Sequence, residues 1–180
     1  MKTLKTIQTL SKVAKILCKV VFVCCIVGFC GSIVGLISLA VGAPTIKIGG
    51  VTLESIIQKD ADMSMGTLYT AVTVGMILCA GEAVLAKFAE LYFVRELADG
   101  TPFNLDGAKQ LFTLGILTVF IPLVTLFIAQ ITQAIMAKAL TDVQPLSLDG
   151  FGSVMLGVGF MVTSLICRYG AEQEALKVEN

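Results

Sequence analysis

The sequence contains no histidine and no tryptophan, and only 14% of its 180 residues are charged. Without histidine, the chain cannot form a Ser–His or Cys–His catalytic pair or a histidine-based metal site. The formal net charge is zero, so there is no excess of basic residues with which to bind nucleic acid. We therefore expect no catalytic residue, no metal, no other cofactor and no direct contact with nucleic acid.

The cysteines offer little further chemistry, because no two of them are spaced as a CxxC pair. All lie within or beside apolar stretches, where free cysteine behaves as a small buried hydrophobe. The sequence therefore favours structural cysteines over a disulfide framework or a metal cluster. They are Cys18, Cys24, Cys25, Cys30, Cys79 and Cys167.

Apolar residues are abundant instead: they make up 56% of the chain, and its mean hydropathy is +0.91. A soluble domain has roughly a quarter charged residues, so lipid is the solvent that suits this composition. Each of four stretches without Asp, Glu, Lys or Arg reaches or nearly reaches the roughly 20 residues that cross a bilayer as a helix. These stretches are 20–46, 63–81, 110–137 and 150–167.

We predict an all-α integral membrane protein, an antiparallel four-helix bundle formed by a single domain over residues 1–180. The first span has the lysine-rich lead of a secretory signal, but its apolar run exceeds the roughly 7–15 residues of a signal core, which favours a retained anchor. The expected spans are about 16–41, 67–97, 105–138 and 150–169, followed by a cytoplasmic tail at 170–180.

Lysine and arginine indicate the orientation, because they are enriched in the cytoplasmic loops of membrane proteins. Ten of them lie on the side of the two termini and of the connector between the second and third spans, and three lie on the other side. We therefore predict that both termini are cytoplasmic. The ten are Lys2, Lys5, Lys12, Lys15, Lys19, Lys87, Arg95, Lys109, Arg168 and Lys177, and the three are Lys47, Lys59 and Lys138.

Two segments outside the spans have patterns of their own. Residues 1–15 place apolar side chains on one helical face and lysines elsewhere, as in a basic amphipathic helix that lies on an anionic inner leaflet. The loop 42–66 alternates apolar and polar residues around Gly49 and Gly50, which predicts a short extracytoplasmic β-hairpin.

The segment ELADGTPFNLDGAKQLFTLG connects the second and third spans. Asp99 and Gly100 are expected to end one helix, with the glycine in the left-handed conformation. Pro102 prevents continuation of the helix, and Phe103 is placed to pack back as a hydrophobic staple. We predict that this connector, together with Lys109, lies at the cytoplasmic surface.

Small residues recur every three or four positions in three spans, so they share a helix face and let another backbone approach closely. In the first span this helix-packing stripe includes Gly28, Gly31 and Gly35, which serve either the bundle interior or a homo-oligomer. The other stripes are Gly75, Cys79, Glu82, Ala86 and Ala89 in the second span, and Gly115, Thr118, Pro122, Thr125 and Ala129 in the third.

Glu82 lies in the second stripe, so it is expected to face protein, about 9 Å inside the membrane at 1.5 Å per residue. Thr118 falls at a similar depth. A carboxylate there costs about 2.5–3.5 kcal/mol on insertion scales, so the presence of Glu82 needs a structural or functional explanation. Glu82 is either a proton or cation site, or a structural acid bonded to Thr118 or a thiol, or one that snorkels toward Lys87 or Lys19. The structural alternatives are favoured.

The connector also resembles the pattern DG-x-PF-x-x-x-x-x-K/R-x-L-x-x-LG of a family of small bacterial four-span proteins, catalogued as domain of unknown function 2975. The resemblance implies a bacterial cytoplasmic-membrane protein without an assigned activity, whose gene often neighbours that of a small helix-turn-helix regulator. The matching positions are Asp99, Gly100, Pro102, Phe103, Lys109, Leu111, Leu114 and Gly115, with Arg168, Gly170, Gln173 and Glu174 near the end of the chain.

Together these features predict a non-enzymatic regulatory protein of the bacterial inner membrane. It would bind or sequester a cytosolic helix-turn-helix transcription regulator through its cytoplasmic face. Two alternatives stay open: a small proton or cation transporter or channel that uses Glu82, and an immunity protein against a membrane-active peptide.

Overall fold

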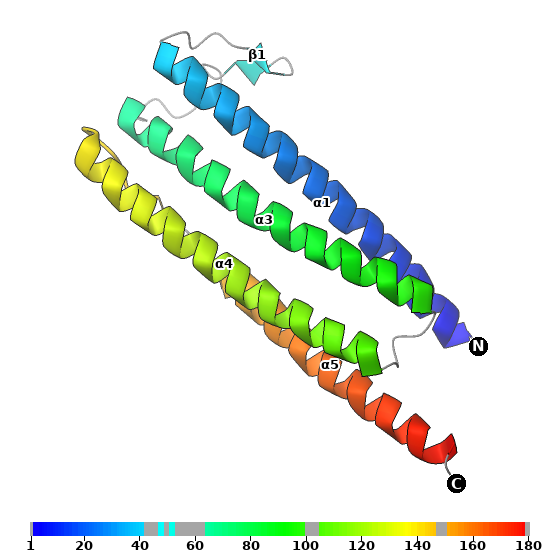
Figure 1. Ribbon diagram of the computed structural model, residues 1–180. Coiled ribbons are helices and arrows are strands. Elements are labelled where there is room, and N and C mark those ends of the chain that lie inside the picture. The colour runs from blue at the N-terminus through cyan, green and yellow to red at the C-terminus, as the bar shows by residue number, and fades with distance from the viewer. Residues whose placement is uncertain are drawn as a thin grey trace. The chain divides into compact units, whose positions relative to one another are not determined.

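A computed structural model of the chain describes residues 2–41, 47–48, 51–52, 64–99, 105–146 and 151–178. The fold is all-α, a four-helix bundle, as the sequence predicts. Its long helices are α1 (Lys2–Val41), α3 (Met65–Asp99), α4 (Leu105–Ala139) and α5 (Phe151–Val178) (Figure 1). The predicted hairpin is also confirmed, because strands β1 (Lys47–Ile48) and β2 (Val51–Thr52) pair antiparallel.

The predicted bounds of the two middle helices agree with the structure to within two residues, whereas the outer helices are longer than predicted. Helix α1 begins at Lys2, so residues 1–15 do not form an arm separate from the first span. The reason is that no glycine or proline interrupts residues 2–27, and nothing therefore breaks the helix at the edge of the span. Similarly, α5 continues through most of the predicted tail to Val178.

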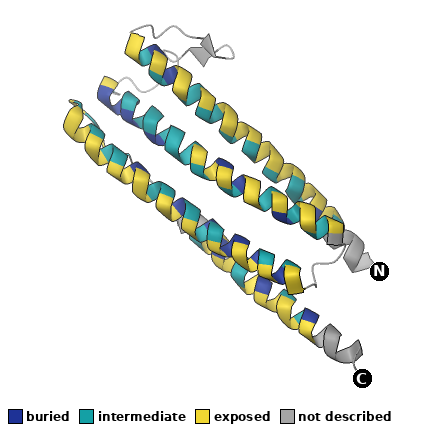
Figure 2. Ribbon diagram, in the orientation of Figure 1, coloured by how far each residue is buried: buried dark blue, intermediate teal, exposed yellow. Residues whose placement is uncertain are grey.

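All four helices are long and apolar enough to cross a membrane, over Gln8–Val41, Met65–Ala98, Leu105–Ala139 and Val154–Glu172. Large apolar side chains point outward, as Figure 2 shows by the exposed surface along each helix. The side chains of Val27, Phe120 and Ile166 are each more than 60% exposed. By length and composition, therefore, the chain is a multi-pass membrane protein.

The side chains that are buried are mostly small. Thr67, Thr70, Thr118 and Ser38 are the largest of the fully buried ones. The hydroxyls of Thr70 and Thr118 each donate to the carbonyl oxygen four residues earlier, at 2.8 Å, so burial leaves neither hydroxyl without an acceptor. Small, internally bonded residues of this kind are typical of helix contacts in membranes.

The contacts between helices divide the chain into two compact units. Unit 1 consists of Met1–Val23, Glu82–Leu123 and Asp149–Asn180, and unit 2 of Cys24–Gly81 and Val124–Leu148. Unit 1 thus contains the first part of α1, the second part of α3, the first part of α4 and α5. Unit 2 contains the remaining parts of α1, α3 and α4, with the hairpin.

In unit 1, α4 and α5 cross at a pair of glycines. A Cβ atom added to Gly115 would lie 3.0 Å from the carbonyl oxygen of Gly157, and one added to Gly157 would lie 2.9 Å from that of Gly115. Next to this crossing, the hydroxyl of Ser164 donates to the carbonyl oxygen of Ala108 at 2.7 Å. Gly157, Ser164 and Ala171 are all buried and recur every seven residues, so α5 has a small-residue stripe that the sequence analysis missed.

In unit 2, two of the three predicted glycines of α1 pack against α3. A Cβ atom on Gly28 would lie 3.1 Å from the sulfur of Cys79, and one on Gly35 would lie 3.6 Å from Val72. At Gly31, by contrast, an added Cβ would meet no described atom within 4 Å. The helix face that contacts α3 therefore passes through Gly28 and Gly35 and leaves Gly31 to one side.

A polar clamp closes the end of unit 2 where α3 begins. Ser64 is the N-cap of α3, since its hydroxyl oxygen accepts the backbone N–H of Thr67 at 3.2 Å. The hydroxyl of Thr67 donates to the carbonyl oxygen of Asp142 at 3.0 Å and accepts the backbone N–H of Gln144 at 2.9 Å. Asp142 itself adopts the left-handed conformation, with φ at 60°, as a short polar residue can. The segment after α4 is thereby fixed to the first turn of α3.

Candidate functional site

Glu82 and Thr118, the expected intramembrane polar site, are not bonded to each other in the part of the chain that the structure describes, although such a bond is one of the alternatives for Glu82. Thr118 is buried, but its hydroxyl donates to the carbonyl oxygen of Leu114, and no hydrogen bond joins the described side chains of Thr118 and Glu82. The prediction that Glu82 faces protein is wrong, because its side chain is exposed. Ala86 of the same predicted stripe is buried, as is Ala83 next to Glu82, so only Glu82 departs from the buried face at this point of α3.

The connector lies between the end of α3 at Asp99 and the start of α4 at Leu105, as predicted. Gly100, Pro102 and Phe103 fall outside the described residues, so the expected left-handed glycine and hydrophobic staple stay predictions. Lys109, in the first two turns of α4, is exposed.

Basic residues collect in unit 1. Among the residues that the structure describes, every lysine and arginine belongs to unit 1 except Lys47 and Lys138. Exposed examples occur on each helix of this unit: Lys12 on α1, Arg95 on α3, Lys109 on α4 and Arg168 on α5. Unit 1 therefore contains most of the lysine and arginine residues, together with acidic residues such as Glu90, Asp106 and Glu172.

A buried polar contact joins α1 to α3 within unit 1. The hydroxyl of Ser11 donates to Oε1 of Glu96 at 3.0 Å, and Ser11 is only 5% exposed. Tyr92, one turn before Glu96 and also buried, interacts with the same carboxylate. Hydrogen bonds to charged groups stabilise by about 1.5–3 kcal/mol, so this cluster fixes the start of α1 against α3. Ser11 is thus packed on α3, whereas Leu10 and Leu17, on the apolar face that the sequence analysis expected to lie on the membrane, are exposed.

A second contact between the same helices lies further along them. The Lys87 ammonium is 2.8 Å from Oε2 of Glu90 and 5.4 Å from the centre of the Phe22 ring on α1. The lysine side chain is 49% exposed, so solvent screens the ion pair and it adds little stability. Together with Ser11 and Glu96, this contact shows that α1 and α3 run antiparallel through unit 1.

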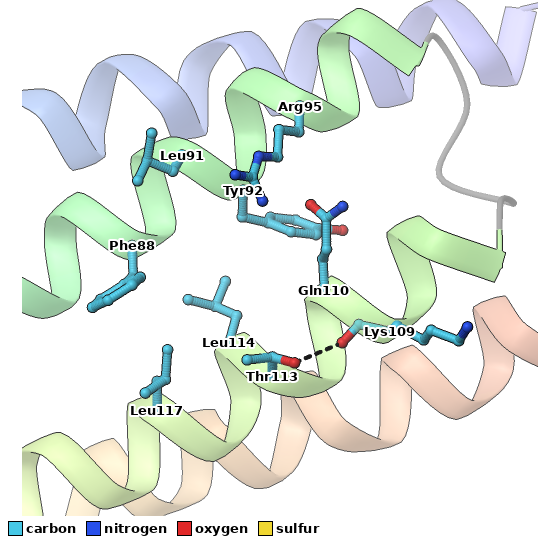
Figure 3. Close-up of a pocket in the computed structure, with 9 residues that line it drawn as sticks. All are labelled: Phe88, Leu91, Tyr92, Arg95, Lys109, Gln110, Thr113, Leu114 and Leu117. Atoms are coloured by element: carbon cyan, nitrogen blue, oxygen red, sulfur yellow. Dashed lines mark hydrogen bonds between the residues drawn. The ribbon is translucent and has the colours of Figure 1, made fainter.

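A pocket of about 280 Å³ opens between α3 and α4 in unit 1 (Figure 3). Its floor includes Tyr92 and Leu114, which form a buried cluster with Leu111. One end of the pocket is apolar and the other polar. It is lined by Phe88, Leu91, Tyr92, Arg95, Lys109, Gln110, Thr113, Leu114 and Leu117.

Sequence reasoning missed both the cluster at Glu96 and the pocket. Glu96 was one charge among several in the connector, and Ser11 was one polar residue of the arm, so neither stood out. The available signal was that α1 continues without a break beyond its span, which places Ser11 on a helix face that can meet α3. The pocket depends on how two helices approach one another, and a single-helix pattern does not contain that.

Comparisons with known proteins add no relative: no family model, no curated protein and no solved structure matches the chain. The resemblance at the connector therefore stays a prediction. Among the described residues, no group of three or more His, Cys, Asp or Glu side chains could hold a metal ion. The described geometry therefore offers a pocket in unit 1 that has one polar and one apolar end.

Proposed function

We propose that this chain is a non-enzymatic regulatory protein of a bacterial inner membrane, which binds a soluble cytosolic partner through a cytoplasmic face formed by residues of unit 1. The observation that carries the proposal is the collection of exposed lysine and arginine side chains in that unit. Basic residues near the ends of spans stay in the cytoplasm, so a basic end is the end that meets cytosolic proteins.

The surface of unit 1 supports a binding role. Lys12, Arg95, Lys109 and Arg168 come from four different helices, and packing at Ser11 and at Gly115 fixes these helices against their neighbours. Charges held on packed helices form a pre-arranged surface, which costs less conformational entropy on binding than a flexible tail would.

The partner we propose is a small helix-turn-helix transcription regulator, as the resemblance at the connector implies. Binding would hold the regulator at the membrane and away from DNA. Transport through Glu82 is the weaker alternative, since this exposed side chain does not line the pocket described above. No described feature favours an immunity role.

The test is a pull-down of the regulator encoded beside the gene, using the full-length protein purified in detergent. Lys109→Glu should reduce capture by about tenfold or more, because it places a negative charge on the proposed surface. Lys138→Glu is the matched control, since Lys138 is an exposed lysine at the other end of α4. Absence of capture, or equal loss in both variants, would contradict the proposal.

A further inference from the structure

The pocket between α3 and α4 changes polarity along its length. Phe88 and Leu117 line one end, and Arg95 and Gln110 line the other. Phe88 and Arg95 are seven residues apart on α3, which corresponds to about 10 Å along a helix. A ligand that fills both ends must therefore be amphiphilic, with an apolar part at Phe88 and a polar part at Arg95.

Arg95 and Lys109 give the polar end of the pocket its positive charge. Arg95 forms no ion pair with any residue whose side chain the structure describes. Lys109 has only a loose, exposed pair with Asp106, at 4.0 Å. In Figure 3 the Arg95 side chain bends back along α3, while the Lys109 ammonium points away from the pocket. The headgroup of the ligand should therefore be an anion held mainly by Arg95.

Phosphate is the anion that this end fits best. A guanidinium group presents a planar fork of N–H donors that matches two phosphate oxygens. The Gln110 amide lies on the facing helix and can donate a further hydrogen bond. In Figure 3 the Gln110 side chain points from α4 toward α3.

The apolar end opens to lipid. Phe88 is 45% exposed and Leu91 is 41% exposed, and exposed apolar side chains on a membrane-spanning helix face acyl chains. The cationic end lies toward the connector, where α3 ends and α4 begins, so it is at the membrane surface. Basic pockets between membrane helices on the cytoplasmic side are sites for anionic lipid headgroups.

We propose that this pocket binds one anionic phospholipid, with Arg95 holding the phosphate and the Phe88–Leu117 end holding the upper acyl chain. At about 280 Å³ the pocket is slightly smaller than the roughly 300–1,000 Å³ of drug-sized sites, so it accommodates a headgroup and part of one chain. The proposal goes beyond the proposed function, because it requires no soluble partner.

The experiment is native mass spectrometry of the full-length protein released from detergent micelles that contain phosphatidylglycerol or phosphatidylcholine. Phosphatidylglycerol should be retained at least about fivefold more than phosphatidylcholine. Arg95→Gln, at an exposed position, should lower phosphatidylglycerol retention by about fivefold, and Arg95→Lys should restore part of it. Arg168→Gln, a matched loss of an exposed arginine in unit 1, should leave retention unchanged.

Three results would overturn the proposal. Equal retention of the two lipids would mean that the negative charge of the headgroup does not contribute to binding. Equal effects of Arg95→Gln and Arg168→Gln would mean that the lipid responds to the general charge of unit 1 and not to the pocket. Binding of glycerol phosphate as tight as that of phosphatidylglycerol would mean that the ligand is a soluble phosphate. Since the assay contains no regulator, its outcome does not depend on the proposed function.

Discussion

Replacement of Gly115 with alanine is expected to destabilise the packing of α4 against α5. The added methyl group would lie 2.8 Å from Cγ of Met161 and 3.0 Å from both the backbone nitrogen of Met161 and the carbonyl oxygen of Gly157. Two of these three neighbours are backbone atoms, which cannot rotate away, so one helix must shift. Overpacking of this kind costs about 1–3 kcal/mol.

Alanine also raises helix propensity by up to about 1 kcal/mol over glycine, and this gain has to be separated from the overpacking cost. Gly159→Ala is the matched control, because a Cβ atom there would meet no described atom within 4 Å. The measurement is SDS titration in mixed micelles, followed by energy transfer between labels on α4 and α5. The free energy of unfolding of Gly115→Ala should be about 1–3 kcal/mol below that of Gly159→Ala. Equal free energies of unfolding for the two variants would show that α4 and α5 do not pack closely at Gly115.

Three further predictions concern other contacts. Gly28→Leu should lower the thermal unfolding midpoint in detergent, because a Cβ atom at this position would lie 3.1 Å from the sulfur of Cys79 on α3. Gly31→Leu should be tolerated, and equal midpoints for the two variants would be inconsistent with the face described for α1. Ser64→Ala removes the N-cap of α3 and should cost about 1 kcal/mol, measured as faster hydrogen exchange in its first turn. Ser11→Ala removes a hydrogen bond to Glu96 and should speed exchange at the start of α1 alone; unchanged exchange would argue against the docking of this segment.

The number and approximate length of the helices could be predicted because each depends on a local property. A run without charged residues that is long enough to cross a bilayer predicts a helix wherever it packs. Helix ends were predictable where a glycine or proline breaks the chain, as between Asp99 and Leu105. The start of the first helix could not be predicted within residues 1–15. The composition changes there from basic to apolar, but no residue breaks the backbone, so the helix continues through the change.

The faces of the helices were less predictable, because spacing alone leaves a rotation of one position open. The third stripe was placed correctly, with Gly115, Thr118 and Ala129 all buried. In the second span the predicted Ala86 is buried, but Glu82 is exposed and its neighbour Ala83 is buried in its place. One position is a rotation of about 100° on a helix, which is enough to move a side chain from the protein interior to the surface.

The candidate site could be predicted only as a charge distribution. Counting lysine and arginine identified the basic side of the molecule, but the pocket at Arg95 and the contact between Ser11 and Glu96 each join residues of different helices. The residues in that contact are 85 positions apart in the sequence. No periodicity within one helix contains information about such pairs.

The central claim is that the chain crosses the membrane with both termini and the connector between α3 and α4 in the cytoplasm. Single cysteines replacing Lys109 and Lys138, both exposed and near opposite ends of α4, test it in a background in which the six native cysteines are replaced. The two positions are about 44 Å apart along the helix, more than the roughly 30 Å of hydrocarbon. A membrane-impermeant maleimide added to intact cells should label Lys138→Cys, and should label Lys109→Cys only after lysis. Labelling of Lys109→Cys in intact cells would contradict the account.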